Sequence, residues 1–459
     1  MTATAFSSLP LSENMLANLE SLAYTEMTAI QAQSLPIILA GQDVIAKART
    51  GSGKTAAFGI GLLTPLNPRY FGCQAIVICP TRELADQVAK EIRRLARNAD
   101  NTKVLTLCGG QPIGPQIGSL EHGAQIIVGT PGRILKHLGK GTLKLDGVNT
   151  LVLDEADRML DMGFYDSIAE IIEQCPEQRQ TLLFSATYPA GIKKLAARFM
   201  RDPQHVEVEG QHDNAQIQQR FYEIKAEQRL EVLSKALACF QPQSCVVFCF
   251  TKLQCQEVAD DLNRQGVSAQ ALHGDLEQRE RDQVLIMFAG RSISVLVATD
   301  VAARGLDIDN LDLVINYELA RDADTHIHRI GRTGRAGEKG MAVSLVGPAE
   351  THRAQRIEEL QGSPLNWHPT NSLKPQSTQA LQAPMVTLCI SAGRKDKLRP
   401  GDILGALTGE AGLPGKQIGK ISITDYQAYV AVERAIAEQA LERLSTGKIK
   451  GRSWKIRML

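Results

Sequence analysis

Short apolar runs rich in β-branched residues recur through most of the chain, and segments with helical periodicity separate them. Runs without polar interruption are typical of strands in a parallel sheet that helices cover on both faces. The runs form two series on either side of a polar stretch at 207–219: 75–79, 125–128, 150–153 and 181–184, then 245–250, 295–298 and 313–315. We therefore expect two α/β domains in tandem, the first over 1–208 and the second over 216–360.

The end of the chain has a different character. A segment with several prolines among serine, asparagine and glutamine predicts a linker over 361–384. Residues 385–459 contain 13 lysines and arginines against 7 acidic residues, although the whole chain has a net charge of only +1. A basic end on a nearly neutral chain indicates a module that binds a polyanion. Within it we expect a strand at 428–432 and a helix at 433–444.

Composition excludes several classes of protein. No run of about 18 apolar residues appears, and the first residues lack the basic start and apolar core of a signal peptide. The nine cysteines include no Cys-x-x-Cys pair, so we interpret them as buried, reduced thiols rather than a zinc or redox site. These observations predict a soluble cytoplasmic protein that has no contact with a membrane.

The segment 48–55, with the sequence Ala-Arg-Thr-Gly-Ser-Gly-Lys-Thr, follows the apolar run 44–46 and precedes a helical pattern at 56–63. Glycines let several backbone N–H groups point at one phosphate chain, and the following helix N-terminus favours negative charge. Lys54 can then reach the β- and γ-phosphates, and Thr55 can ligate Mg²⁺. We interpret the segment as an ATP-binding loop, with a purely structural glycine turn as the alternative.

Two further segments suit phosphate chemistry. Asp154 and Glu155 follow the apolar run 150–153, at the sheet edge where ligands collect; we expect Asp154 to bind the metal and Glu155 to orient water. In the run 328–335, three arginines recur at three-residue spacing, which on a helix places them along one face. Because this run belongs to the second α/β domain, we expect the ATP site to lie between the domains. The alternatives are a solvated helix start and an exposed basic helix.

At this point the chain resembles the DEAD-box RNA helicases. The motifs that carry the resemblance stand in the family's order at 48–55 (ARTGSGKT), 80–85 (PTRELA), 130–133 (TPGR), 154–157 (DEAD), 185–187 (SAT), 298–307 (ATDVAARGLD) and 328–335 (HRIGRTGR). The resemblance covers about residues 6 to 350. It implies two RecA-like domains and an RNA-dependent ATPase that uses ATP and Mg²⁺.

The resemblance also assigns roles to single residues near the nucleotide. Tyr24 would stack on adenine and Gln31 would hydrogen-bond its edge, while Ala23 and Met27 stand where the family usually has Gly and Pro. The expected ATP contacts are Phe6, Tyr24, Thr28, Gln31, Thr50, Gly51, Ser52, Gly53, Lys54, Thr55 and Asp307. The expected catalytic groups are Lys54, Glu155 and the arginine fingers Arg332 and Arg335. The expected coupling residues are Asp157, Ser185, Thr187, His328 and Arg329.

The family's RNA contacts fall on hydroxyls, backbone amides and arginines, which read phosphate and 2′-OH rather than base edges. By resemblance they are Pro80, Thr81, Arg82, Gly110, Thr130, Pro131, Gly132, Arg133, Thr251, Gly274, Asp275, Gln278, Arg281 and Thr299. We therefore expect the two domains to grip RNA without sequence preference. Phe250 stands where the family frequently has Asn.

Residues 385–459 resemble the C-terminal RNA-recognition module of the DbpA subfamily, whose members recognise a hairpin of 23S ribosomal RNA and act in large-subunit assembly. The resemblance implies an RRM-like α+β domain. The predicted contacts are Arg394, Lys395, Lys397, Arg399, Lys416, Lys420, Tyr429, Lys448, Lys450 and Arg452, followed by Lys455 and Arg457. Tyr429 falls on a stacking position, although an ordinary half-exposed strand residue and a solvated basic surface are the alternatives.

Together these observations predict a monomer that melts short rRNA helices locally, with hydrolysis reopening the closed domains. Two other interpretations remain. One is a DNA-directed helicase or translocase on the same fold. The other is an rRNA-binding placeholder whose ATPase is vestigial, against which the intact Lys54, Glu155 and Arg335 speak.

Overall fold

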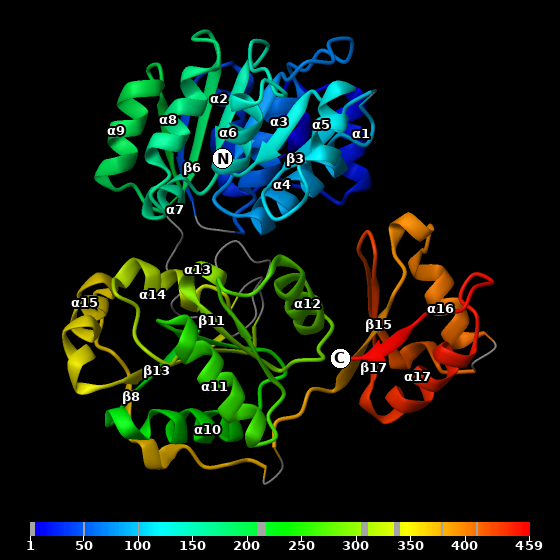
Figure 1. Cartoon of the computed structure of the whole chain (residues 1–459). Helices are drawn as coiled ribbons and strands as arrows, with labels where there is room; N and C mark the ends of the chain where they lie inside the picture. The colour runs from blue at the N-terminus through cyan, green and yellow to red at the C-terminus, as the bar shows by residue number, and fades with distance from the viewer. Residues whose placement is uncertain are drawn as a thin grey trace. The chain divides into compact units, whose positions relative to one another are not determined.

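In a computed structural model, the described residues form three β-sheets, two of seven strands and one of four (Figure 1). The structure describes residues 5–48, 51–99, 101–208, 217–303, 311–334, 340–377, 380–409 and 412–459. The first sheet belongs to one compact unit, and the second and third sheets belong to another. Across these described residues, no helix combines the length and the apolar character needed to cross a membrane.

The first sheet is entirely parallel, with strand order β3-β4-β2-β5-β6-β1-β7. Its strands are β1 Val44–Lys47, β2 Ala75–Ile78, β3 Val104–Leu107, β4 Ile126–Gly129, β5 Thr150–Leu153, β6 Gln180–Ser185 and β7 Gln204–Glu207. The apolar runs in this half of the sequence therefore predicted their strands to within one or two residues. All the described carboxyl ends meet at one edge because the strands are parallel.

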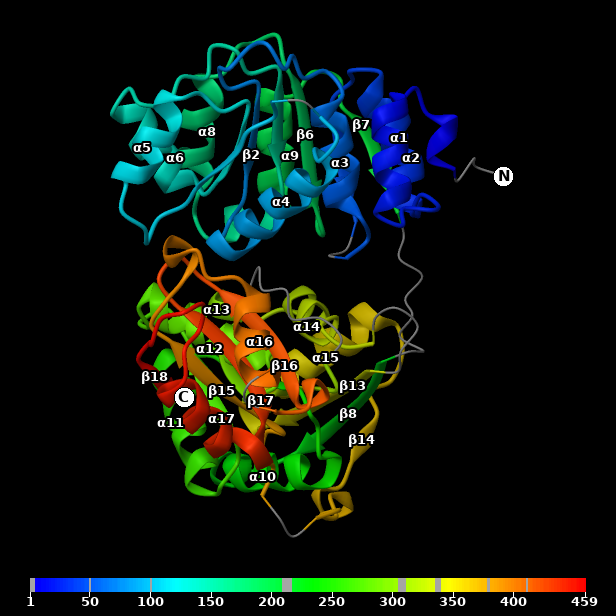
Figure 2. The same cartoon turned by 90° about the vertical axis from the view of Figure 1, so that its right-hand side faces the viewer.

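Helices cover both faces of the first sheet (Figure 2). They are α1 Glu13–Ser21, α2 Ala29–Leu39, α3 Lys54–Leu63, α4 Arg82–Leu95, α5 Gly114–Glu121, α6 Pro131–Gly139, α7 Ala156–Asp161, α8 Tyr165–Glu173 and α9 Ala190–Phe199. One buried core joins α1 to α4 to one face of the strands, where Phe58 packs on Phe184 with ring centroids 5.3 Å apart. A second core joins α6 to α9 to the other face. Two buried faces explain why the strand runs lack alternating polar residues.

The second sheet repeats this design, with parallel order β10-β11-β9-β12-β13-β8-β14. Its strands are β8 Ile217–Glu223, β9 Cys245–Cys249, β10 Ala269–Leu272, β11 Val295–Thr299, β12 Leu313–Asn316, β13 Gly340–Val346 and β14 Trp367–His368. Its helices are α10 Arg229–Phe240, α11 Lys252–Arg264, α12 Gln278–Ala289, α13 Asp300–Ala303, α14 Ala323–Ile330 and α15 Thr351–Gln361. The cores place α10 and α11 on one face and α14 and α15 on the other.

The described residues of 361–384, the segment predicted as a linker, pack against the second sheet. This segment contributes β14 to the edge of the second sheet, and Leu373 and Leu381 are buried in the core beside α10 and α11. The Ala383 N–H donates a hydrogen bond to the Ser268 hydroxyl at 3.0 Å. Leucines spaced between the prolines bury enough apolar surface to hold the segment in place.

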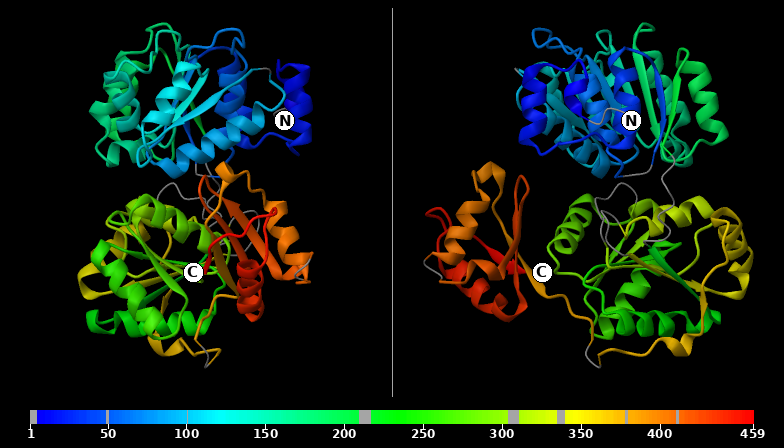
Figure 3. Two further views of the ribbon diagram at one scale, coloured as in Figure 1. Left: turned by 45° about the vertical axis from the view of Figure 1, so that its right-hand side comes forward. Right: turned by 180° about the vertical axis from the view of Figure 1, so that it is seen from behind.

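The third sheet is antiparallel, with order β16-β17-β15-β18, and confirms the expected small α+β module (Figure 3). Its elements are β15 Met385–Ile390, α16 Pro400–Thr408, β16 Ile418–Ile423, β17 Ala428–Glu433, α17 Ala437–Thr446 and β18 Ile456–Met458. Val386, Leu388, Val430 and Val432 join both helices in one core. Their strand neighbours point to the opposite face.

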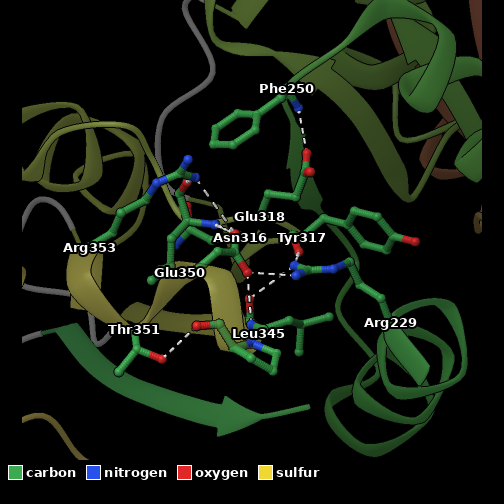
Figure 4. A network of polar contacts seen from close by, with 12 residues as sticks. Arg229, Phe250, Asn316, Tyr317, Glu318, Leu345, Glu350, Thr351 and Arg353 are labelled. Carbon is green, nitrogen blue, oxygen red and sulfur yellow. Dashed lines mark hydrogen bonds and ion pairs between the residues drawn. The ribbon is translucent and has the colours of Figure 1, made fainter. Parts of the chain in front are cut away.

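A buried carboxylate ties three parts of the second sheet together (Figure 4). Glu350 accepts a hydrogen bond from Arg229 at 2.6 Å and others from the N–H groups of Leu319 and Gly347 at 2.9 and 2.8 Å. Arg229 also donates to the carbonyls of Tyr317 and Leu345. Both charged side chains are largely excluded from solvent, so each charge depends on its partner.

We predict that Arg229→Met destabilises the second sheet by about 3–5 kcal/mol, because it removes the nearer ion-pair partner of the buried Glu350 carboxylate and leaves only Arg353, 3.9 Å away. Lys235→Met is the matched control, since the Lys235–Glu231 pair on the same helix is exposed and should cost below about 1 kcal/mol. Native-state hydrogen exchange of β13 amides measures both changes. Equal losses of protection would contradict the assignment.

His326 on α14 is a second buried polar group in this unit. Its Nε2 lies 3.2 Å from the Gln219 side-chain oxygen, and its ring packs against Phe221. Burial, with the nearby Arg329 charge, lowers the pKa of His326 to about 3. The unfolded chain binds a proton at this residue below about pH 6.5 while the folded chain does not, so folding loses stability as pH falls below that value.

We predict that the second unit loses about 1.4 kcal/mol of stability per pH unit below pH 6.5 through His326 alone. His326→Gln should remove that part of the slope, because the amide does not titrate. Denaturant titrations at pH 7.0 and 5.5 measure it, with the exposed His352→Gln as control. A slope unchanged by His326→Gln would contradict the prediction.

Candidate functional site

The predicted phosphate loop connects β1 to α3, as the sequence pattern indicated. Gly51 and Gly53 adopt left-handed backbone conformations with φ of 82° and 93°, which glycine accommodates without strain. The loop ends at the N-terminus of α3, where backbone N–H groups are free of intrahelical partners. The loop residue Thr50 lies outside the described residues.

The side chains predicted to bind adenine form hydrogen bonds with this loop. The Thr28 hydroxyl donates to the Ser52 carbonyl at 2.8 Å, and the Gln31 amide donates to the Gly53 carbonyl at 3.1 Å. The Gln31 oxygen meanwhile accepts from the Thr28 N–H at 2.9 Å. One pocket of about 570 Å³ is lined by Tyr24, Thr28, Gln31, the loop, Lys54, Thr55, Asp154 and Glu155. The structure thus brings the predicted base, phosphate and metal residues of the first unit together.

Tyr24 is held from two sides. Its hydroxyl donates to Glu91 at 2.6 Å, and burial together with this bond raises its pKa. Phe6 does not line the pocket but packs edge-on behind Tyr24, with ring centroids 6.0 Å apart. Ala23 has φ of 61°, a left-handed conformation that costs roughly 1 kcal/mol more for alanine than for glycine. No pattern in the sequence indicated a role for Glu91.

Asp154 and Glu155 lie at the carboxyl end of β5 and are both buried. Burial raises the pKa of Asp154 to about 6, against the attraction of Lys54. Glu155 has a left-handed backbone (φ 52°), and its carboxylate accepts a hydrogen bond from the buried Arg158 one turn later. Strained backbone of this kind is concentrated at functional sites. Arg158 was missed in the sequence, where only its i+3 spacing from Glu155 indicated the contact.

The residues around Lys54 fit a polyphosphate with a divalent cation. The Lys54 ammonium is buried and makes no hydrogen bond to any described residue. An unpaired buried ammonium is costly, and a phosphate group would satisfy it. Asp154 lines the same pocket, where a cation would favour its charged form.

The predicted coupling residues of the first unit form a hydrogen-bonded set. Asp157 accepts from the Thr187 backbone N–H and hydroxyl at 2.9 and 2.8 Å, and its own N–H donates to Ser185 at 3.3 Å. The Ser185 carbonyl in turn accepts from the Ala48 N–H at 3.0 Å. The set therefore connects the strand β6 to the start of the phosphate loop.

The predicted RNA residues of the first unit share one sheet edge. The segments 80–82, 109–110 and 130–133 follow β2, β3 and β4, which are neighbours in the sheet. The Arg82 guanidinium lies against Gly110, where a Cβ would come within 1.7 Å of it. Arg133 donates to Gln116 and to the Gln111 carbonyl at 2.8 and 2.9 Å. The edge thus presents arginines and backbone groups in fixed positions.

The second unit repeats this arrangement. Thr251, Gly274 with Asp275, and Thr299 follow or end β9, β10 and β11, again adjacent strands, while Gln278 and Arg281 lie on α12. Thr251 caps α11 by accepting from the Gln254 N–H at 3.1 Å. Three guanidinium groups lie near the Phe250 ring. Those of Arg321, Arg329 and Arg353 are 5.6, 5.8 and 5.0 Å from the ring centre, and Figure 4 labels Phe250 and Arg353. An apolar ring at this position therefore attracts arginines.

The arginine run does not form the single helix face that its spacing predicted. Helix α14 ends at Ile330, and the Leu311 N–H bonds the Arg332 carbonyl in the turn that follows. Arg329 is almost fully buried: it binds both Asp300 oxygens at 2.6 and 2.8 Å and the Asn316 oxygen at 3.0 Å. Such a pattern suits a structural residue. His328 lies in the last turn of α14. Asp307 and Arg335 lie outside the described residues.

In the C-terminal module, the predicted basic contacts are exposed: Arg394, Lys395, Lys397, Arg399, Lys416, Lys420, Lys448, Lys450 and Arg452. Lys450 donates to the Lys397 carbonyl at 2.6 Å, which brings the far tail beside the 394–397 loop. Tyr429, by contrast, is only 3% exposed, and burial raises its pKa to about 12. Its predicted base stacking therefore requires the sheet face to be uncovered.

We predict that Gly53→Ala raises the KM for ATP at least tenfold. A Cβ at Gly53 would lie 2.5 Å from the Gln31 amide nitrogen and 2.9 Å from the Thr28 hydroxyl, and a 1.4 kcal/mol loss is tenfold. Gly41→Ala is the matched control, because Gly41 is also left-handed (φ 77°) but has open space around it. ATPase titrations compare them; an equal KM in both variants would contradict the contact.

Three family models match successive parts of the chain. The DEAD/DEAH box helicase model matches 28–195, the helicase conserved C-terminal domain matches 228–337, and the DbpA RNA binding domain matches 387–458. The three matches correspond to the three sheets in order.

Known proteins extend these matches. The ATP-dependent RNA helicase DbpA of Escherichia coli K12 is 55% identical over 459 residues, or 99% of this chain and 100% of the relative. The DEAD-box ATP-dependent RNA helicase CshA of Bacillus subtilis is 46% identical over 78% of this chain and 72% of its own length. The solved structure of Saccharomyces cerevisiae Dbp5 bound to RNA and ADP BeF3 has a TM-score of 0.73 and 30% identity, over 81% of this chain and 97% of that one. With its nucleotide loop, its Asp-Glu-Ala-Asp segment and its basic module, the chain belongs to the DEAD-box ATP-dependent RNA helicases.

Proposed function

We propose that this RNA-dependent ATPase remodels ribosomal RNA, and that its C-terminal module directs it to a hairpin of 23S rRNA during large-subunit assembly. The observation that carries the proposal is the match of 387–458 to the DbpA RNA binding domain, on a module whose basic residues are exposed. The near full-length similarity to E. coli DbpA supports it. We place the protein in the cytoplasm as a monomer.

We assign hydrolysis to a small set of groups. Lys54 neutralises phosphate charge, Glu155 orients the attacking water, and Arg332 with Arg335 stabilises the transition state from the second unit. Arg158, which holds the Glu155 carboxylate, positions that group. Tyr24 and Gln31 select adenine, and Asp307 contacts the ribose.

Mg²⁺ would be held by the Thr55 hydroxyl and Asp154, and it would supply positive charge against the phosphate oxygens. The unpaired Lys54 ammonium and the raised pKa of Asp154 support this assignment. Asp157, Ser185 and Thr187 transmit the nucleotide state to the RNA grip, with His328 and Arg329 serving on the second unit.

The two rows of residues at the sheet edges would hold one RNA strand by its backbone. Domain closure on ATP and RNA bends that strand, and each base-pair step disturbed costs roughly 1.4 kcal/mol of stacking in DNA. One closure can therefore melt only a short helix. Hydrolysis and product loss then reopen the two units.

We predict that RNA carrying the 23S hairpin stimulates ATPase activity at concentrations at least tenfold lower than the same RNA with a scrambled hairpin. Binding of the module makes capture of a nearby strand intramolecular, at an effective concentration in the mM range. The measurement is steady-state ATP turnover of the full chain on both RNAs, with Glu155→Gln as the inactive control.

A chain that ends before residue 385 provides the matched comparison. It should respond weakly and equally to both RNAs, because it lacks the targeting module. Equal stimulation of the full chain by both RNAs would contradict the targeting. Stimulation by single-stranded DNA as strong as by RNA would favour a DNA-directed enzyme instead.

A further inference from the structure

The sheet face that carries Tyr429 is covered in this chain. The Thr387 and Ser292 hydroxyls lie 2.7 Å apart and are both buried, and Arg457 on β18 donates to Gln283 on α12 at 3.2 Å. A Cβ at Gly290 would lie 3.3 Å from the Ala431 methyl group. Because one compact unit holds both sheets, this face forms part of its interior. RNA bound by the module therefore needs another surface.

Tyr426 is the one exposed aromatic side chain among the module's three, the others being Tyr429 and Trp454. It is 65% exposed and lies in the turn between β16 and β17. The Lys395 ammonium sits 4.2 Å from the centre of the ring and donates to the Tyr426 hydroxyl. The hydroxyl end of the ring thus carries a cation, and most of the side chain faces solvent.

Two loops hold this pair in place. The N–H groups of Arg394 and Lys395 donate to the carbonyls of Thr424 and Asp425 at 2.9 and 3.0 Å. Gly393 permits this contact, since a Cβ there would lie 2.5 Å from the Asp425 backbone. An exposed aromatic ring on a hydrogen-bonded turn loses little conformational freedom when a ligand binds.

Positive charge is concentrated in the loop that holds the ring. Arg394, Lys395 and Lys397 come from one loop, and Lys450 reaches it from the tail through the Lys397 carbonyl. Of the nearby carboxylates, Asp396 accepts from the Gly393 N–H at 3.0 Å, and Asp425 lies 3.6 Å from Arg394. An aromatic face within a cationic rim is the chemistry that binds an unpaired nucleotide, with the base stacked and its phosphate neutralised.

We propose that Tyr426 stacks on an unpaired base of the RNA held by the C-terminal module, while Lys395, which is bonded to the Tyr426 hydroxyl, meets the adjoining phosphate. This inference rests on the proposed function and names the surface that reads the RNA. Stacking is tolerant of base identity, so Tyr426 contributes affinity, and the choice of sequence comes from its neighbours.

The test is the Kd of the full chain for a fluorescent 23S hairpin, measured at two salt concentrations. Tyr426→Ala should weaken binding by roughly 5- to 150-fold, as loss of one stacked base does, without changing the salt slope. Tyr426→Phe should stay within about twofold, because stacking needs no hydroxyl. Lys395→Gln should lower the salt slope by about one. Leu404→Ala removes a different exposed apolar side chain of the module and is the matched control.

A Tyr426→Ala Kd equal to that of Leu404→Ala, or a Tyr426→Phe loss as large as the Ala loss, would overturn the stacking. A 2-aminopurine placed in the hairpin loop gives a second readout, since its quenching on binding should disappear in Tyr426→Ala alone. The two proposals fail separately. A wild-type chain without preference for the hairpin contradicts the targeting, whereas an unchanged hairpin Kd in Tyr426→Ala, with the wild-type preference intact, contradicts only the stacking.

Discussion

Two parallel sheets, each buried on both faces, determine where the polar loops of this molecule can lie. Parallel strands send all their carboxyl ends to one edge, and buried faces leave that edge as the place where polar loops emerge. The nucleotide loop, the Asp154–Glu155 pair and the segments predicted to contact the RNA backbone all lie at that edge, because each follows the carboxyl end of a strand. The chemistry is therefore assembled from short loops, each a few residues beyond a strand end.

This order explains how much the sequence could predict. Apolar runs located eight of the fourteen described strands of the two parallel sheets to within one or two residues, and the residues directly after a strand, Asp154 and Glu155, were placed correctly at the edge. Side-chain contacts between separate segments could not be predicted from apolar runs. Glu91 reaches Tyr24 from α4, and the Arg158 bond to Glu155 depends on a left-handed turn. Neither follows from periodicity.

The failures have physical causes as well. The arginine run keeps helical spacing, but the chain leaves the helix at Ile330 because Arg332 bonds back to Leu311. Tyr429 fits a stacking pattern, yet the pattern does not reveal that α12 lies within hydrogen-bonding reach of that sheet. Prolines indicated a linker, whereas Leu373 and Leu381 decided its course. In each case tertiary packing overrode a local rule.

The pinned segment before the third sheet has a geometric consequence. Sixteen residues separate His368 from Met385, and such a stretch left free would span up to about 60 Å. Its last residues are held instead by Ser268, whose N–H donates to the Leu381 carbonyl and whose hydroxyl accepts from the Ala383 N–H. The free part of the connecting segment is therefore short, so the module stays close to the second sheet. An RNA held by the module would therefore present to the second sheet only those strands that lie close to the anchor.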